Sequence, residues 1–139
     1  MKNAIQSVVM SLILLLVVPI VNFTEAASWE RYNVSITKDV WEAQVDQQVQ
    51  IVADLKNNQN REQPFAYLVQ IQNEDGVTIS LSWITGSLAA RQSMSPSQSW
   101  TPTEPGTYNA QIFVWESVDN PDALSAPLEI KINVETRST

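Results

Sequence analysis

The predicted fold is decided by one stretch, Pro105-Gly106-Thr107-Tyr108-Asn109-Ala110-Gln111-Ile112-Phe113-Val114-Trp115-Glu116. The Pro-Gly pair is a turn signal, because proline fixes the approach to a turn and glycine accepts backbone conformations that other residues resist. Apolar and other side chains then alternate, and successive side chains of a strand point to opposite faces. The stretch therefore predicts a turn at Gly106 that leads into a strand, with Tyr108, Ile112 and Val114 facing the core.

The same alternation predicts strands at 32–37, 45–55, 65–72, 77–84 and 128–135. The expected core-facing residues include Val49, Ile51, Ala53, Leu55, Phe65, Tyr67, Val69, Ile71, Leu128, Ile130, Ile132 and Val134, and also Val77, Ile79, Leu81 and Trp83. Asn73-Glu74-Asp75-Gly76 is a strong hairpin signal. Trp41 is expected in a linking turn, and loops are expected at 56–63 and 117–127. A short strand is expected near 88–94, followed by a Ser/Pro-rich connection.

About seven short strands without helical periodicity indicate an all-β protein, an immunoglobulin-like antiparallel sandwich of two sheets. Tyr108, at the head of a late strand, is placed like the tyrosine corner of such sandwiches. The length of 139 residues allows one domain, assigned to 27–139, after a short targeting segment. Gly106 and Tyr108 are thus predicted to be structural residues.

Composition excludes several functions. The chain has 8 basic and 15 acidic residues, a formal net charge of −7, so a nucleic-acid backbone would be repelled. It contains no histidine and no cysteine, which excludes Ser-His-Asp and Cys-His catalysis, His-ligated zinc and blue copper. Paired carboxylates remain available for glycoside chemistry, but no pair is marked out by its surroundings. We therefore expect no enzyme.

The N-terminus has the pattern of a signal peptide. Lys2 precedes an apolar run from Val8 to Val21, which is short for a bilayer span of about 20 residues. Thr24 and Ala26 fit a signal peptidase site, so residues 1–26 are predicted to be removed. The alternative is an uncleaved signal-anchor, in which case this segment alone would contact the membrane. Either alternative predicts a secreted protein or one of the cell envelope.

Several motifs together resemble the CARDB-type and related immunoglobulin- and fibronectin-like modules of prokaryotic, and in particular archaeal, secreted and cell-surface proteins. They are 45–55 with Asn57-Asn58, 65–71, Asp75-Gly76, 86–90, Trp100 and 105–108. The resemblance covers about residues 31–135 and implies a sandwich without catalytic residues. Two features depart from it: Ala90-Arg91 stands where such modules usually have a glycine, and 116–121 only partly matches their acidic, Asn-rich segment.

Phe113 and Trp115 are the candidate partner contacts. They lie on the face of their strand opposite Tyr108, Ile112 and Val114, and large amphipathic rings dominate interaction hot spots. The alternatives are that the facing is inverted, or that a loop or the N-terminal strand covers both rings.

Two further features concern ions and sugars. Glu116, Asp119 and Asp122, with Asp75 or Glu74, offer the oxygen ligands that Ca²⁺ prefers, although their spacing matches no defined calcium loop. Solvated acidic loops are the alternative, and no other cofactor is indicated. Asn33 begins an Asn-Val-Ser sequon and is a candidate glycosylation site in an exported chain.

We therefore expect an exported, non-catalytic immunoglobulin-like domain that acts in adhesion, envelope organisation or protein–protein interaction. The alternative is an extracellular carrier that binds a glycan or a small ligand through exposed aromatic residues. In both hypotheses the partner is an extracellular protein or glycan of unknown identity.

Overall fold

The computed structural model describes residues 29–137, so the predicted signal segment at 1–26 lies outside the described residues. Within 29–137 the elements are all strands: β1 (Tyr32–Ser35), β2 (Val40–Gln44), β3 (Val49–Val52), β4 (Asp54–Asn57), β5 (Gln63–Gln72), β6 (Thr78–Leu88), β7 (Ser93–Met94), β8 (Ser97–Trp100), β9 (Gly106–Trp115) and β10 (Leu128–Glu135). No helix in this part of the chain could cross a membrane.

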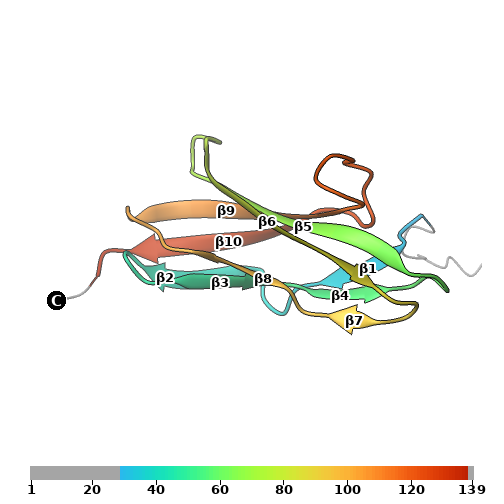
Figure 1. The fold of residues 1–139 in the computed structure, drawn as a ribbon. Coiled ribbons are helices and arrows are strands. Elements are labelled where there is room, and N and C mark those ends of the chain that lie inside the picture. Colours follow the sequence, from blue (N-terminus) through green and yellow to red (C-terminus); the bar gives the residue numbers. More distant parts are fainter. Residues whose placement is uncertain (1–28, 138–139) are drawn as a thin grey trace, which may run out of the picture.

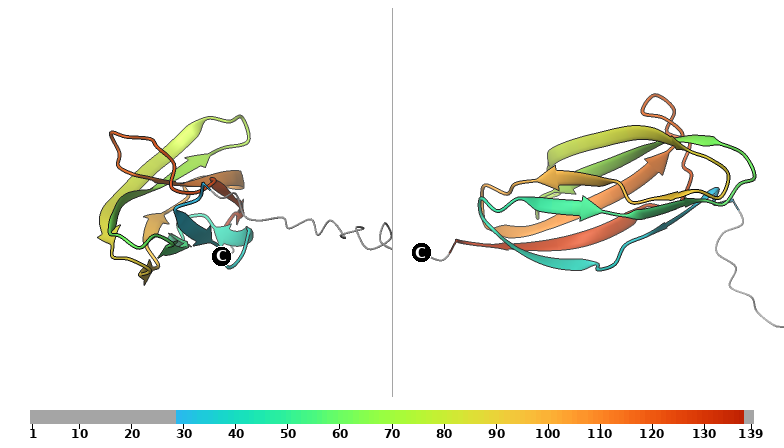
Figure 2. Two further views of the ribbon diagram at one scale, coloured as in Figure 1. Left: turned by 90° about the vertical axis from the view of Figure 1, so that its right-hand side faces the viewer. Right: turned by 60° about the horizontal axis from the view of Figure 1, so that its bottom comes forward.

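The strands form two layers (Figures 1 and 2). One layer is a five-stranded sheet in the order β2-β10-β9-β5-β6, and the other combines the short sheets β1-β4-β7 and β3-β8. Neighbouring strands are antiparallel except for β2 and β10, which run parallel. The N-terminal part of the chain therefore changes layer between β1 and β2. The predicted sandwich is confirmed, with more strands than the alternation indicated.

The core lies between the layers, and β5, β9 and β10 supply much of it. Their core-facing residues are buried, as predicted: Phe65, Tyr67, Val69, Ile71, Tyr108, Ala110, Ile112, Val114, Ile130, Ile132 and Val134. β9 pairs with β5 on one side and with β10 on the other. At roughly 1.5–3 kcal/mol for each fully buried large aliphatic side chain, these three strands provide a large part of the hydrophobic stabilisation.

The predicted facing of 77–84 is wrong. Ser80, Ser82 and Ile84 of β6 face the core side, because they pair with the inward residues of β5. Leu81 and Trp83 lie on the outer face and are 54% and 51% exposed. Val77 and Ile79 are also exposed. In an edge strand, apolar and polar side chains can alternate although the apolar ones face the solvent. Alternation shows only that side chains point to two faces in turn, and it does not show which of the two faces lies against the core.

Three further local predictions are corrected. Trp41 is not in a linking turn but in β2, where parallel pairing with β10 extends the chain. The predicted strand at 45–55 is divided at Ala53, whose amide leaves the ladder and donates to the Pro96 carbonyl at 3.3 Å. The predicted connection after 94 is largely strand, because Ser97–Trp100 pairs with β3 as β8.

The loop expected at 56–63 is shorter in the structure, because both of its ends belong to strands and contain buried residues. Asn57 is completely buried at the end of β4, and its side-chain amide donates to the carbonyls of Arg61, Leu88 and Ala89 at 2.7, 3.1 and 3.2 Å. Gln63 is buried as the first residue of β5. A polar side chain can enter the interior when its hydrogen bonds are satisfied there, and Asn57 holds the end of β6 and the loop at 58–62 together in this way.

The turn before β9 has the geometry expected of a tyrosine corner. Gly106 has a φ of +148°, a conformation that side chains with a Cβ resist. The Tyr108 hydroxyl donates a 2.7 Å hydrogen bond to the Glu104 carbonyl, a few residues upstream. Trp100 packs edge-on against Tyr108, with ring centroids 4.9 Å apart. Together these contacts close one end of the sandwich.

Candidate functional site

An apolar surface lies on the outer face of the five-stranded sheet, and we call it the outer patch. It is made of Ala66, Leu68, Leu81, Trp83, Phe113 and Trp115. Register brings them together: Leu68 of β5 pairs with Trp83 of β6 on one side and with Phe113 of β9 on the other. Directly paired residues of neighbouring strands share a face. The outer patch is therefore continuous across three strands.

Phe113 and Trp115 lie on this face, as their alternation indicated. Both are partly exposed, and their ring centroids are 5.7 Å apart with the planes tilted by 46°. Trp115 lies opposite Ala66, which is completely buried, and Leu68 is only 4% exposed although it too is on the outer face. The neighbouring large side chains thus shield the middle of the patch from water while part of their own surface stays exposed. Their role as partner contacts is a prediction.

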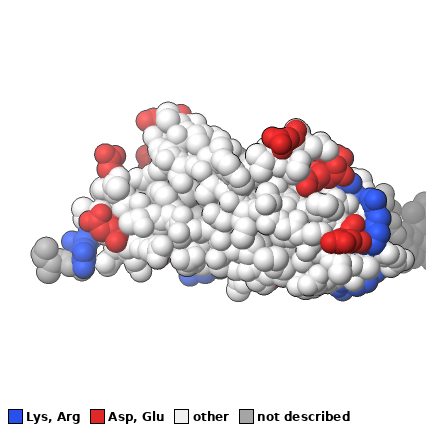
Figure 3. Space-filling model, in the orientation of Figure 1, with Lys and Arg blue, Asp and Glu red and all other residues white. Residues whose placement is uncertain are grey.

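Two projections flank the outer face (Figure 1). One is the β5–β6 turn at 73–77, and the other is the loop between β9 and β10 at 116–127. Both are acidic: the turn contains Glu74 and Asp75, and the loop contains Glu116, Asp119 and Asp122. Acidic atoms are visible on both projections in Figure 3. The outer patch therefore lies between two regions of negative charge.

The hairpin turn is shaped by its own side chain. Asn73 accepts hydrogen bonds from the amides of Asp75 and Val77 through Oδ1, both at 3.0 Å. Gly76 has a φ of +75°, as the Asp-Gly signal predicts. The turn is thus ordered by local hydrogen bonds, and it presents its two carboxylates at the tip.

The 116–127 loop is fastened to the N-terminus of the domain. Arg31 contacts Glu116 at 2.5 Å and Asp122 at 3.1 Å, and the Glu116 carboxylate also accepts from the Asn120 side chain at 2.7 Å. The Leu124 amide donates to the Val114 carbonyl at 2.8 Å, and the Leu124 side chain is completely buried. The loop is therefore held at both ends next to the outer patch.

These contacts also bear on the calcium hypothesis. Glu116 and Asp122 converge on the guanidinium of Arg31, which supplies the positive charge at the place where the sequence offers ligands for Ca²⁺. Among residues 29–137 no group of three or more carboxylates is placed to hold a metal ion. Asp75 and Glu74 lie on the other projection. We therefore do not propose a metal at this site.

Asn33 lies in β1 with its side chain exposed. An oligosaccharide on an exposed side chain needs no rearrangement of the core, so the sequon is accessible in the folded chain. Glycosylation of Asn33 stays a prediction, and the mass of the corresponding peptide before and after deglycosylation would test it.

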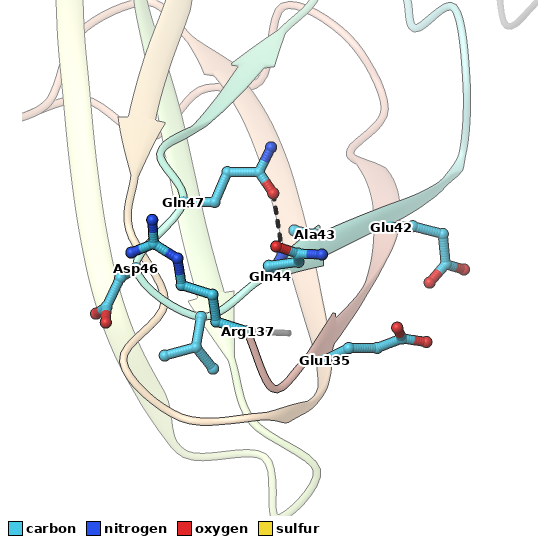
Figure 4. Close-up of a pocket in the computed structure, with 8 residues that line it drawn as sticks. Glu42, Ala43, Gln44, Asp46, Gln47, Glu135 and Arg137 are labelled. Atoms are coloured by element: carbon cyan, nitrogen blue, oxygen red, sulfur yellow. Dashed lines mark hydrogen bonds between the residues drawn. The ribbon is translucent and has the colours of Figure 1, made fainter. Parts of the chain in front are cut away.

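A surface hollow of about 510 Å³ lies between the ends of β2 and β10 (Figure 4). It is lined mainly by polar and charged residues, but these do not converge. Arg137 points to one side of the hollow, while Glu42 and Glu135 point to the other. The Glu42 carboxylate accepts a hydrogen bond from the side-chain amide of Asn133 at 3.0 Å. This hollow lacks the convergent polar groups of a small-molecule site.

A second hollow, of about 460 Å³, opens beside the Trp100–Tyr108 pair. Ile79, Ser80, Thr103 and Glu104 also line it. The Tyr108 hydroxyl already donates to the Glu104 backbone, so the aromatic pair there serves to close the sandwich. The outer patch is therefore the better candidate for a functional surface.

Sequence reasoning missed three parts of the site. It assigned Trp83 and Leu81 to the core, and it did not single out their neighbour Leu68. The signal that could have found them is the composition of 66–68, Ala-Tyr-Leu, which is apolar on both faces and marks a strand covered on both sides. The contact of Arg31 with Glu116 joins distant parts of the chain, and no local sequence pattern predicts it.

A family model described as S-layer A-like matches residues 14–137. No curated protein matches. Among solved structures, the CARDB domain of the PF1109 protein from Pyrococcus furiosus, in complex with di-metal ions, is 18% identical with a TM-score of 0.57, over 80% of this chain and 93% of that one. The solution structure of the same domain is 22% identical with a TM-score of 0.56, over 75% and 94%.

A part of a larger enzyme is also similar in fold. The β-glucosidase from Listeria innocua is 13% identical with a TM-score of 0.54, over 76% of this chain and 16% of the enzyme. At this level of identity each solved structure shows a shared fold alone. The expected resemblance to CARDB-type modules is confirmed in that sense.

Proposed function

This chain belongs to the S-layer A-like family, and we propose that it is an exported, non-catalytic immunoglobulin-like module that binds another protein of the cell envelope through its outer patch. Membership of the family supports a place at the cell surface. The absence of histidine and cysteine from the whole sequence supports a role other than nucleophilic or zinc-dependent catalysis.

The observation that carries this proposal is the row formed by Trp83, Leu68 and Phe113, with Trp115 beside it. A sheet face turned to water ordinarily carries polar side chains. Here three strands in succession place large apolar groups there, and contiguous exposed apolar surface of this kind marks binding sites. Partly exposed aromatic rings around a shielded aliphatic centre also match the composition of interaction hot spots.

The two acidic projections suggest the chemistry of the partner. A partner that presents an apolar centre between basic groups would fit both the outer patch and its flanks. Complementary charge accelerates association and selects among partners more than it strengthens the final complex. Raising the salt concentration should therefore slow association, because exposed charges are screened over about 10 Å at 0.1 M ionic strength.

Binding of the exported chain to isolated cell envelopes tests the proposal. Phe113→Ser and Trp115→Ser should each weaken binding about tenfold or more, because removal of a hot-spot ring costs on the order of 2 kcal/mol. Met94→Ser is the matched control: Met94 is 40% exposed but lies in the opposite layer. Crosslinking from the outer patch on intact cells would then identify the partner.

Two results would contradict the proposal. Envelope binding that is unchanged in both variants would exclude the outer patch. A saturable shift of tryptophan fluorescence with a glycan, lost in Trp115→Ala while envelope proteins are not captured, would favour the alternative of a glycan or small-ligand carrier.

A further inference from the structure

β6 is an edge strand of unusual length for its position. It is the last strand of the five-stranded sheet and pairs with β5 alone. It contains 11 residues, which extend over about 35 Å at the rise of a strand. β2, the opposite edge of the same sheet, contains 5 residues and includes Glu42. β6 thus has a long row of backbone groups without a strand partner within the described domain.

No charged residue protects this edge. The sequence from Val77 to Ala90 contains no Lys, Arg, Asp or Glu, although the whole chain has 23 of them. Natural proteins commonly guard exposed edges with charges, prolines or bulges. The ladder of β6 with β5 has one irregularity, between the pairs Ile71–Ser80 and Gln72–Thr78, and it lies at the beginning of β6. In Figure 3, where the side of the molecule with β6 in front is seen, charged atoms lie on the two upper projections, toward the two ends and at the lower rim, and are absent from the middle. The middle of this side therefore differs from the acidic projections that rise above it.

We propose that β6 pairs with β6 of a second copy of this chain, antiparallel and about a two-fold axis. The two five-stranded sheets would then form one continuous sheet of ten strands. This inference concerns the backbone edge of β6 and a second copy of the chain, so it goes beyond the proposed function, although Leu81 and Trp83 also belong to the outer patch. The two-fold arrangement closes on itself and gives a dimer, not an open filament.

The choice of a second copy follows from charge. Two identical molecules of net charge −7 repel each other, and the repulsion is smallest where they meet through an uncharged side. The edge of β6 is such a side. A basic partner, in contrast, would gain most from the acidic projections and nothing from this edge.

The strand is also self-complementary in one register. With Ser82 opposite Ser82 of the second copy, Leu81 lies opposite Trp83 on the outer face. Ser80 then lies opposite Ile84 on the inner face, and Ile79 opposite Thr85 on the outer one. Aromatic–aliphatic cross-strand pairs contribute about 0.2–1 kcal/mol each, and every other pair in this register is uncharged. The outer patches of the two copies would adjoin across the new pair of strands.

Sedimentation of the exported chain, in the form in which it is recovered from cells, tests the dimer. The dimer fraction should rise with concentration, and Ile84→Lys should weaken dimerisation about tenfold or more, because it places an inward-pointing charge on the edge. Val40→Lys is the matched control: the same charge is added at a position 41% exposed, against 37% for Ile84, on the opposite edge strand β2.

Cysteine crosslinking tests the register and does not depend on the lysine variant. The natural chain has no cysteine, so an introduced thiol reacts only with its copy in a second molecule. Ser82→Cys should form a disulfide-linked dimer on mild oxidation, because the two side chains face each other at the axis. Thr85→Cys should not, because its counterpart lies six positions away along the second strand at about 20 Å.

A chain that stays monomeric at every concentration would overturn the proposal. So would a dimer that Ile84→Lys leaves intact and that Ser82→Cys does not crosslink. Phe113→Ser should keep the dimer while it weakens envelope binding, so the failure of either proposal is distinguishable from the failure of the other.

Discussion

Leu68 and Phe113 are paired across β5 and β9 on the outer face of the larger sheet, and Leu68 is almost completely buried there. A leucine on the solvent side of a sheet is ordinarily exposed. This one is enclosed because its strand neighbours on both sides, Trp83 and Phe113, are large. The outer face therefore has a small apolar interior of its own, and this has consequences for stability as well as for binding.

Leu68→Ala should destabilise the domain by about 2 kcal/mol or more, the lower part of the range for buried leucines. Leu81→Ala, on the same face but 54% exposed, should change the free energy of unfolding by less than about 0.5 kcal/mol. Urea unfolding of the two variants checks the difference. Equal losses would mean that Leu68 is not enclosed by its neighbours.

Asn57→Ala should cost at least about 1–3 kcal/mol, because it leaves buried carbonyl groups of Leu88 and Ala89 without their donor. Asn58→Ala is the matched control, since Asn58 is the next residue and is exposed. The free energies of unfolding of the two variants, measured by denaturant titration, test this difference. A similar small loss in both variants would refute a structural role for the Asn57 side chain.

Arg91→Gly should stabilise the domain, by up to about 1 kcal/mol. Arg91 has a φ of +65°, which costs roughly 1–2 kcal/mol for a residue with a Cβ, while glycine adopts it freely but loses more entropy on folding. Ala90→Gly, one residue earlier, should instead destabilise by a fraction of a kcal/mol. Melting temperatures of both variants measure the difference, and the opposite order would contradict the left-handed conformation at Arg91.

Tyr108→Phe should lower the free energy of unfolding by about 0.5–1.5 kcal/mol, the usual net contribution of one hydrogen bond. The substitution removes the donor to the Glu104 carbonyl and keeps the ring against Trp100. Tyr108→Ala should cost more, because the ring packing is lost too. An unchanged stability in Tyr108→Phe would show that the hydrogen bond does not hold the corner.

The domain should lose stability between about pH 10 and pH 12. Burial raises the pKa of Tyr32 to about 12, and burial also raises the pKa of Tyr67. Their neutral forms donate to the Gln63 and Ile51 carbonyls at 2.6 and 2.9 Å. The unfolded chain releases these protons near pH 10, so stability is fully present below that pH and falls as the pH rises toward the folded values.

The measurement is alkaline titration followed by tyrosinate absorbance and by circular dichroism. Tyrosinate formation should coincide with loss of the folded signal. Tyr32→Phe should move the transition to higher pH, because one of the groups that favour unfolding at high pH is removed. Ionisation of all three tyrosines near pH 10 with the fold intact would contradict their burial.

The sequence alone determined the class of the fold and most of the central strands. Strict alternation at 105–116 and 128–135, joined to turn residues such as Gly76 and Gly106, gives the period of a strand and its ends without reference to distant residues. Missing histidine and cysteine likewise exclude whole classes of chemistry from composition alone. The outward direction of Phe113 and Trp115 followed from the same alternation.

Only the tertiary structure decided which face of β6 is buried, and therefore that Leu81 and Trp83 belong to the exposed outer patch. A period of two allows both facings, and the choice depends on the partner strand: pairing of Leu68 with Trp83 turns Trp83 outward. The burial of Asn57 and the contact of Arg31 with Glu116 depend in the same way on residues far away in the chain. Local patterns cannot carry this information, because it arises when separate strands are brought together.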